Sequence, residues 1–212
     1  MLRHAEIGSN CIASLRGIEQ HAQLESLRLE NNCLRSLDGI QSLAHLASLS
    51  AARNLIADAS AVAKLPLATL DLSRNFLTAP PELPPTVATL RLGHNRLASA
   101  PDAAALPALS HAELQHNNIS DVDALRAALG GGASLRLLEL SANPVASSVA
   151  DFRIEVISLL PALTQLDNDP VSAMEKVRRS RRDRAEIHAA AIGLGAEPRQ
   201  CRPGGRGQHA RR

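Results

Sequence analysis

The sequence predicts an α/β solenoid, a right-handed superhelix of short coils with a parallel sheet on its concave face and a helical C-terminal cap. Three observations lead to this prediction. One pattern of apolar residues and asparagine recurs seven times in nearly constant register. The chain contains 34 Leu but only 2 Phe, no Tyr and no Trp, so leucine must supply most of the core burial. A different apolar pattern, typical of a helix, follows the last repeat.

The repeated unit reads L-x-x-L-x-L-x-x-N-x-L, with alanine, isoleucine or valine in place of some leucines. Its asparagines are spaced by 20 to 26 residues, at Asn10, Asn32, Asn54, Asn75, Asn95, Asn117 and Asn143. This pattern is typical of leucine-rich-repeat solenoids, in which each coil contributes one short strand and neighbouring coils stack. We therefore expect seven leucine-rich repeats over residues 1–145.

The asparagine has a structural role in this interpretation. After each strand the chain must turn inside the protein, where backbone groups have no water to bind. An Asn side chain offers donors and an acceptor, so we expect the seven asparagines to form a buried ladder. Because the chain opens inside a repeat, we also expect either further upstream residues or a partner to cover the first strand.

The segments that join the strands on the convex side differ from coil to coil. We expect a helical turn within 56–66 and an extended path over 78–86, where four prolines remove backbone donors. The long sixth coil predicts a helix over about 120–129. Ser120 is its expected N-cap, and the glycines at 130–132 are expected to stop it.

The last coil of a solenoid needs a cover for its apolar end. Residues 146–171 are predicted to form this cap, because their apolar residues fall on one face of a helix for which Ser148 is the expected N-cap. The predicted cap residues are Phe152, Arg153, Ile157, Leu160, Pro161, Leu166 and Asp167.

The run N-P-V…F-R-x-x-V-I-x-x-L-P-x-L-x-x-L-D over 143–167 resembles the cap of the SDS22-like leucine-rich-repeat proteins. Within that group the chain is most similar to the axonemal dynein assembly factors, in its number of repeats, its lengthened last coil and the L-D-N-D-P-V of 166–171. The resemblance implies a non-catalytic protein-protein interaction scaffold in the cytoplasm, or in the cilium or flagellum. Its client would be a dynein chain or another axonemal or cytoskeletal protein.

The same group leaves two alternatives open. One is a nuclear RNA-processing scaffold resembling the U2 snRNP A′ proteins, and the other is a phosphatase-regulatory protein. Residues 1–175 contain 12 basic and 18 acidic residues, whereas 176–212 contain 11 basic and 3 acidic residues. Nucleic acid is therefore an unexpected partner except through the basic tail, and the near-absence of aromatics argues against base stacking.

The tail itself divides in two. Ser172 and Glu175 form a capping box, which predicts a charged helix over 172–191. The Gly- and Arg-rich residues 192–212 are predicted to be disordered. No stretch of the chain reaches the length of a membrane span, so no membrane partner is expected.

No set of residues in the sequence predicts catalysis, and we expect neither an enzyme nor a bound cofactor. His94 and His116 occupy the same position in adjacent repeats, with His111 and Glu113 nearby; a metal site is the less favoured interpretation and a solvated polar column the favoured one. Cys11 and Cys33 are also one coil apart. They are interpreted as small, buried-edge cysteines in preference to a disulfide or a zinc pair.

The default contact surface of a solenoid is its concave face. The alternate strand residues predict a central column of Glu6, Arg28, Ser50, Asp71, Arg91, Glu113 and Glu139. A basic ridge beside it is formed by Arg53, Arg74, His94 and His116, and its best physical use is to bind an acidic segment. The predicted partner-binding residues are Arg28, Glu30, Asp71, Arg74, Arg91, His94, Glu113, His116 and Glu139. The column contains no aromatic anchor, and an unoccupied, solvated sheet face is the alternative.

Overall fold

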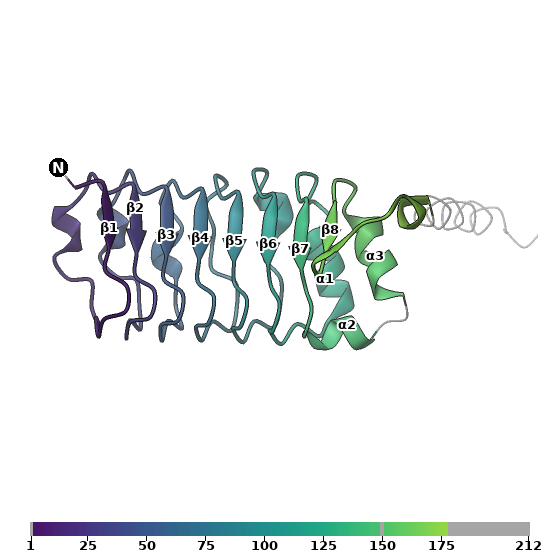
Figure 1. Ribbon diagram of the computed structural model, residues 1–212, viewed down its shortest axis with the longest axis horizontal. Coiled ribbons are helices and arrows are strands. Elements are labelled where there is room, and N and C mark those ends of the chain that lie inside the picture. The colour runs from purple at the N-terminus through teal and green to yellow at the C-terminus, as the bar shows by residue number, and fades with distance from the viewer. Residues whose placement is uncertain (1, 149–150, 178–212) are drawn as a thin grey trace, which may run out of the picture.

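The computed structural model describes residues 2–148 and 151–177, and it confirms the α/β solenoid of leucine-rich-repeat type. The strands lie side by side along the long axis of the molecule, in the order of the sequence, with the cap helices at the C-terminal end (Figure 1). The strands of the nine-stranded sheet are β1 (His4–Glu6), β2 (Ser26–Arg28), β3 (Ser48–Ser50), β4 (Thr69–Asp71), β5 (Thr89–Arg91), β6 (His111–Glu113), β7 (Leu137–Glu139), β8 (Gln165–Leu166) and β9 (Asp169–Pro170).

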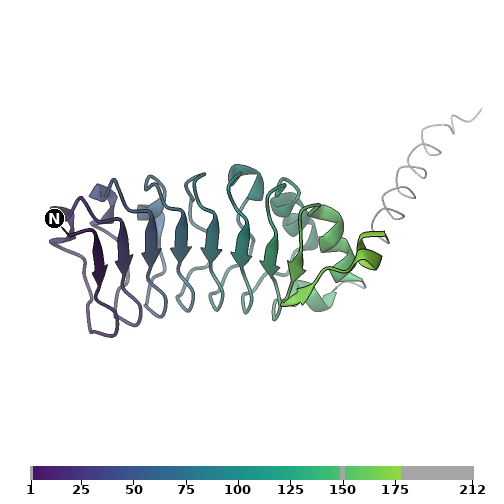
Figure 2. The same ribbon diagram turned by 45° about the horizontal axis from the view of Figure 1, so that its top comes forward.

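The strands from β1 to β8 pair in parallel, each with its neighbour along the chain (Figure 2). The seven strands expected from the repeats are β1 to β7, and the cap adds the other two. Leu166 of β8 pairs with Leu138 and repeats its inward position. The chain then reverses through Asp167 and Asn168, both with positive φ, into the antiparallel β9. Two left-handed residues are what a tight hairpin turn requires.

A single apolar cluster runs through the coils from Leu15 to Leu166. The leucines of the repeat are almost completely removed from solvent, and Phe152 is the only aromatic side chain of the described residues in the core. The core is thus built from one branched side chain reused in each coil, as expected.

The asparagine ladder is present, and Asn75 illustrates its geometry. The Asn75 Oδ1 accepts a hydrogen bond from the Ile56 N–H of the preceding coil at 3.0 Å. Its Nδ2 donates to the carbonyls of Ala51 and Leu72 at 2.9 and 3.0 Å. The expectation of burial is wrong for Asn10 in the first coil, which is exposed and bonds only to carbonyls of its own coil. A rung needs a preceding coil to receive it.

Short helices cross the side of the solenoid opposite the sheet. They are η1 (Ile18–Gln20), η2 (Ile40–Ser42), η3 (Ser60–Val62), η4 (Ala103–Ala105) and the longer α1 (Val122–Leu129). No helix forms over 78–86, as expected for a segment with four prolines.

The caps of α1 differ in part from expectation. Its N-cap is Asp121 and not Ser120, because the Asp121 carboxylate accepts from the N–H groups of Asp123 and Ala124. The glycines after α1 also have a packing role. A Cβ on Gly131 would lie 2.7 Å from the Ala104 Cα of the coil before.

The cap contains α2 (Pro144–Ser148) and α3 (Phe152–Leu159). Ser148 does not cap α3: it is the last residue of α2, and its hydroxyl donates to the Val145 carbonyl. Residue 151 precedes α3 with a left-handed φ of 59° and no side-chain cap. The apolar face of α3 is buried as expected, whereas Pro161 is exposed beyond its end.

Two polar cap residues extend the hydrogen bonding of the coils. The Asp167 carboxylate accepts from the N–H groups of Leu140 and Ser141 at 2.6 and 2.8 Å, and Arg153 donates to the Leu166 carbonyl at 2.9 Å. Glu155, which sequence reasoning missed, is buried in α3 and paired with Arg126 of α1.

The capping box after the cap is confirmed. Glu175 accepts from the N–H and hydroxyl of Ser172, and the described helix runs over 173–177. The rest of the predicted charged helix and the predicted disordered tail lie outside the described residues. Within them, no helix is both long and apolar enough to cross a membrane.

Candidate protein-binding surface

The strand register builds the central column that the repeats predict. Each central residue pairs with the next along β1 to β7, so the row runs in the order Glu6, Arg28, Ser50, Asp71, Arg91, Glu113 and Glu139. Strand neighbours lie about 4.8 Å apart, so these side chains form one continuous row across the open face of the sheet.

Ion pairs hold several of these side chains in place. Arg28 Nε lies 3.0 Å from Glu30 Oε1, and Arg91 Nε lies 2.8 Å from Glu113 Oε1. The hydrogen bond from Glu113 raises the pKa of Arg91, and His111 Nε2 also lies 3.0 Å from the same carboxylate. The arginines of the open face therefore already have carboxylate partners.

The end of the row at β6 and β7 is acidic. Burial, then the charges of Glu113 and Asp167, raise the pKa of Glu139. Like charges in adjacent coils repel each other, so a cation placed against them would relieve the repulsion. This end of the face is suited to a basic group.

The other end of the row contains a hollow of about 320 Å³ between Arg28 and Arg91. Its floor is formed by short polar side chains, among them Ser48, Ser50 and Thr69. The carboxylates of Glu6, Glu30 and Asp71 also line the hollow, so it contains side chains of both charges.

The basic ridge lies beside this face and not on it. Arg53, Arg74, His94 and His116 all have φ between 55° and 57°, in the left-handed region, and all follow the strands in the loops. The rings of His94 and His116 stack at 4.2 Å, which confirms that they lie close together. Burial, then the charges of Arg74 and His116, lower the pKa of His94. At neutral pH, therefore, His94 adds little positive charge to the two arginines of the ridge.

The predicted partner-binding residues thus fall into two groups. The open face brings together Arg28, Glu30, Asp71, Arg91, Glu113 and Glu139, and the ridge holds Arg74, His94 and His116. No group of three or more His, Cys, Asp or Glu residues suited to a metal is found in the described part of the chain. Cys11 and Cys33 are exposed free thiols, so their interpretation as buried-edge residues is wrong.

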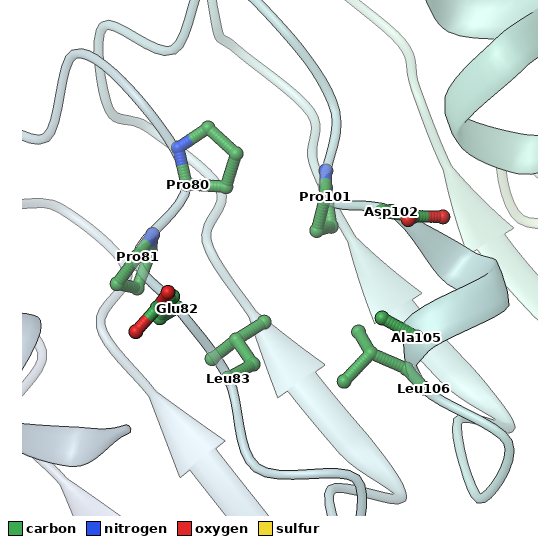
Figure 3. Close-up of a pocket in the computed structure, with 8 residues that line it drawn as sticks. All are labelled: Pro80, Pro81, Glu82, Leu83, Pro101, Asp102, Ala105 and Leu106. Atoms are coloured by element: carbon green, nitrogen blue, oxygen red, sulfur yellow. The ribbon is translucent and has the colours of Figure 1, made fainter.

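The opposite side of the solenoid carries an apolar hollow of about 270 Å³ (Figure 3). Pro80, Pro81 and Leu83 of one coil face Pro101 and Leu106 of the next across it. The proline-bearing coil has no helical turn, whereas the next coil has η4, and this mismatch leaves the gap.

Sequence reasoning also missed two exposed apolar side chains, Leu55 and Phe76. They directly follow the ladder asparagines of adjacent coils. Their exposure could be predicted from the repeat, because the residue between the asparagine and the next core residue points outward from the turn.

Comparison with protein-family models and with curated proteins finds no match. Among solved structures, a leucine-rich-repeat protein of Leptospira interrogans is 24% identical with a TM-score of 0.56, over 84% of this chain and 52% of that one. An internalin of Listeria monocytogenes is 22% identical with a TM-score of 0.50, over 79% of this chain and 41% of that one. This chain thus spans about half the length of either protein.

A third structure, the Drosophila melanogaster SNF/U2A′ complex, is 19% identical with a TM-score of 0.44, over 84% of this chain and 79% of that one. A likeness at that TM-score carries no argument. The two stronger matches show the fold of the chain and nothing finer.

Proposed function

We propose that the chain is a non-catalytic scaffold that holds a protein client against the open face of its sheet. The observation that carries this proposal is the central column, in which charged side chains of both signs stand in one row over six coils. Charge patterns of this kind set the specificity and orientation of a protein partner more than they add raw affinity.

The pattern defines the client chemistry. The hollow between Arg28 and Arg91 is lined by side chains of both charges and by short serines, so an uncharged side chain that both donates and accepts hydrogen bonds fits it. A basic side chain fits the acidic end at Glu113 and Glu139, where burial, and then the charges of Glu113 and Asp167, raise the pKa of Glu139. The client therefore presents uncharged polar groups toward β2–β5 and basic groups toward β6–β7.

The finer proposal is that this client belongs to the assembly of axonemal dynein arms. Its support is the resemblance of the last coil and cap, residues 119–171, to the dynein assembly factors. On this view the cap closes the solenoid and the open face selects the client.

The test is affinity purification from cells with motile cilia, followed by quantitative mass spectrometry. Arg28→Gln with Arg91→Gln removes both positive charges of the hollow, and Arg16→Gln with Lys64→Gln removes two positive charges from exposed positions elsewhere. The first pair is expected to lower recovery of axonemal dynein chains by about tenfold, the equivalent of one lost hot-spot contact. Equal recovery with both pairs, at unchanged unfolding midpoints, would show that the face is only solvated.

The basic tail favours one second candidate, an RNA-processing scaffold. Residues 176–212 carry 11 basic and 3 acidic residues, and such a tail binds phosphate backbones without sequence preference. Deletion of 176–212 separates the two functions. Unchanged recovery of the client supports the scaffold of the open face, whereas loss of an RNA particle as the main partner supports the alternative.

A further inference from the structure

A second exposed surface lies on the loops that follow β3, β4 and β5. The backbone N–H groups of Leu55, Phe76 and Arg96 each donate to a carbonyl of the preceding coil, at 2.8, 2.9 and 2.9 Å. The three residues therefore follow one another on adjacent coils, about 4.8 Å apart. They form a single row along the axis of the solenoid.

The first two members of this row are apolar and accessible. Leu55 is 40% exposed and Phe76 is 38% exposed, and the Arg96 guanidinium lies 4.7 Å from the centre of the Phe76 ring. Single exposed apolar side chains are ordinary on protein surfaces. Two in register on neighbouring coils form a continuous strip, and aromatic and arginine side chains are the commonest hot spots of interfaces.

The basic ridge runs parallel to this strip, because Arg53, Arg74 and His94 each stand two residues before a member of it. A left-handed backbone costs an ordinary residue about 1–2 kcal/mol, and Asn or Gly adopts it more readily. The same loop position is also left-handed at Ser9, Asn31 and Ala142, so the conformation belongs to the repeat and not to the arginines. Because serine, asparagine and alanine fit this turn, folding does not require a long basic side chain there.

The arginines of this surface are free to bind a partner. Arg28 and Arg91 on the open face are paired with carboxylates. By contrast, Arg53, Arg74 and Arg96 form no ion pair within residues 2–148 and 151–177. The surface thus combines an apolar strip with uncompensated positive charge, and its complement is acidic and apolar.

We propose that the surface formed by Arg53, Leu55, Arg74, Phe76 and Arg96 binds an acidic amphipathic helix of a protein partner. The spacing favours a helix lying along the solenoid axis. Residues three or four apart on a helix rise about 4.5 or 6 Å, close to the coil spacing, so one row of carboxylates meets successive arginines. Alternate residues of an extended strand are about 6.6 Å apart and lose this register.

The partner helix places a neighbouring row of apolar side chains on Leu55 and Phe76. Burial of the Phe76 ring then removes water from around the arginines and strengthens their attraction to the carboxylates. The inference rests on the proposed function, since it takes the occupant to be a protein, but it assigns a surface separate from the open face.

The test uses fluorescence anisotropy with the full chain. The probe is a labelled 18-residue helical peptide with glutamates in one row and leucines in the adjacent row. The control probe is a scrambled peptide of the same composition, in which the rows are dispersed. The wild-type chain is expected to bind the helical peptide at least tenfold more tightly than the scrambled one, with an affinity that falls as salt is raised.

Two variants and one control variant locate the site. Phe76→Ser, and separately Arg53→Asn with Arg74→Asn, are expected to weaken binding of the helical peptide about tenfold each. Met174→Ser, at another exposed apolar residue, is expected to bind like the wild type. All the altered side chains are exposed, and Asn suits the left-handed positions, so unfolding midpoints monitored by circular dichroism should be preserved.

Several results would overturn the proposal. These are no binding of the helical peptide, equal binding of the scrambled peptide, or full binding by the Phe76→Ser chain. A fourth is an 18-nucleotide single-stranded RNA that binds more tightly than the peptide and loses this binding in the Arg53→Asn with Arg74→Asn chain. The chain with Arg28→Gln and Arg91→Gln tests the proposed function separately. If this chain loses its client and the wild type does not bind the helical peptide, the open face is supported and the loop surface is refuted. If this chain keeps its client and the wild type binds the helical peptide, the loop surface is supported and the open face is refuted.

Discussion

Replacement of Asn75 by alanine tests the physical basis of the ladder. Asn75 is 5% exposed and makes three close hydrogen bonds to the backbone of two coils. The consequences of its loss are unequal. The Ala51 carbonyl retains a bond from Asn54, and the Leu72 carbonyl retains one from Asn95. The Ile56 N–H has no other partner among the described residues.

The expected cost follows from this inventory. An orphaned buried N–H costs about 1–3 kcal/mol, and two weakened carbonyl sites add a smaller amount, so the free energy of unfolding should fall by about 2–4 kcal/mol. Asn10→Ala is the matched control. Asn10 is exposed, bonds only to the carbonyls of Ile7 and Gly8, and should cost less than about 1 kcal/mol.

Urea unfolding followed by far-ultraviolet circular dichroism measures both variants, because the chain has no Trp or Tyr to report by fluorescence. A clear separation of the two midpoints supports the ladder. Equal shifts for Asn75→Ala and Asn10→Ala would refute the reasoning, since they would show that burial of the backbone groups has no part in the cost.

Three further predictions concern single contacts. Hydrogen bonds from Arg153 and then Ser172 lower the pKa of Glu175 from 4.5 to about 2, so this contact stabilises the fold above pH 4.5 and is lost as the pH falls toward 2. A carboxyl titration by nuclear magnetic resonance should show a midpoint near 2, which Arg153→Gln raises. A wild-type midpoint near 4.5 would contradict this prediction. Arg126→Met leaves the buried Glu155 carboxylate without its cation and should lower the melting temperature, and a second change, Glu155→Met, should restore part of this loss. No recovery in the double variant would show that the broken ion pair is not the cause of the lower melting temperature. Arg74→Asn places a residue that tolerates a left-handed backbone at this position, so it should raise the free energy of unfolding by up to about 1 kcal/mol. The same change should weaken binding of the helical peptide. A less stable protein would show that Arg74 has a structural role.

The period of the sequence was sufficient to predict the coils. The spacing of the ladder asparagines predicts that Arg28, Asp71, Arg91 and Glu113 lie in one row. The register of the strands confirms this prediction. The reason is that a solenoid is nearly one-dimensional: each coil contacts only its neighbours, so position within the repeat determines position in space.

The local caps were less predictable. Both Ser120 and Asp121 are suitable N-caps, and only the path of the loop places the Asp121 carboxylate against the free N–H groups of α1. Ser148 was misassigned for the same reason, because α2 extends to it. Single-residue boundaries depend on loop geometry that the repeat does not encode.

Contacts between non-repeating parts were decided by the tertiary structure alone. Arg126 and Glu155 are 29 residues apart in the sequence, and their ion pair joins α1 to α3. The β8–β9 hairpin forms where β8 of the cap pairs with β7. The exposed strip of Leu55 and Phe76 also belongs to this class.

The sequence by itself therefore determined the coil, the leucine core, the ladder and the order of charges on the open face. Only the tertiary structure decided the burial of Glu155 outside the ladder, which arginines of the described chain lack carboxylate partners, and where the one accessible aromatic of that part lies. The physical reason is that the first group of features depends on contacts between residues one repeat apart, and the repeat makes this separation visible in the sequence. The second group depends on the distance between side chains with no fixed separation, and packing alone sets that distance.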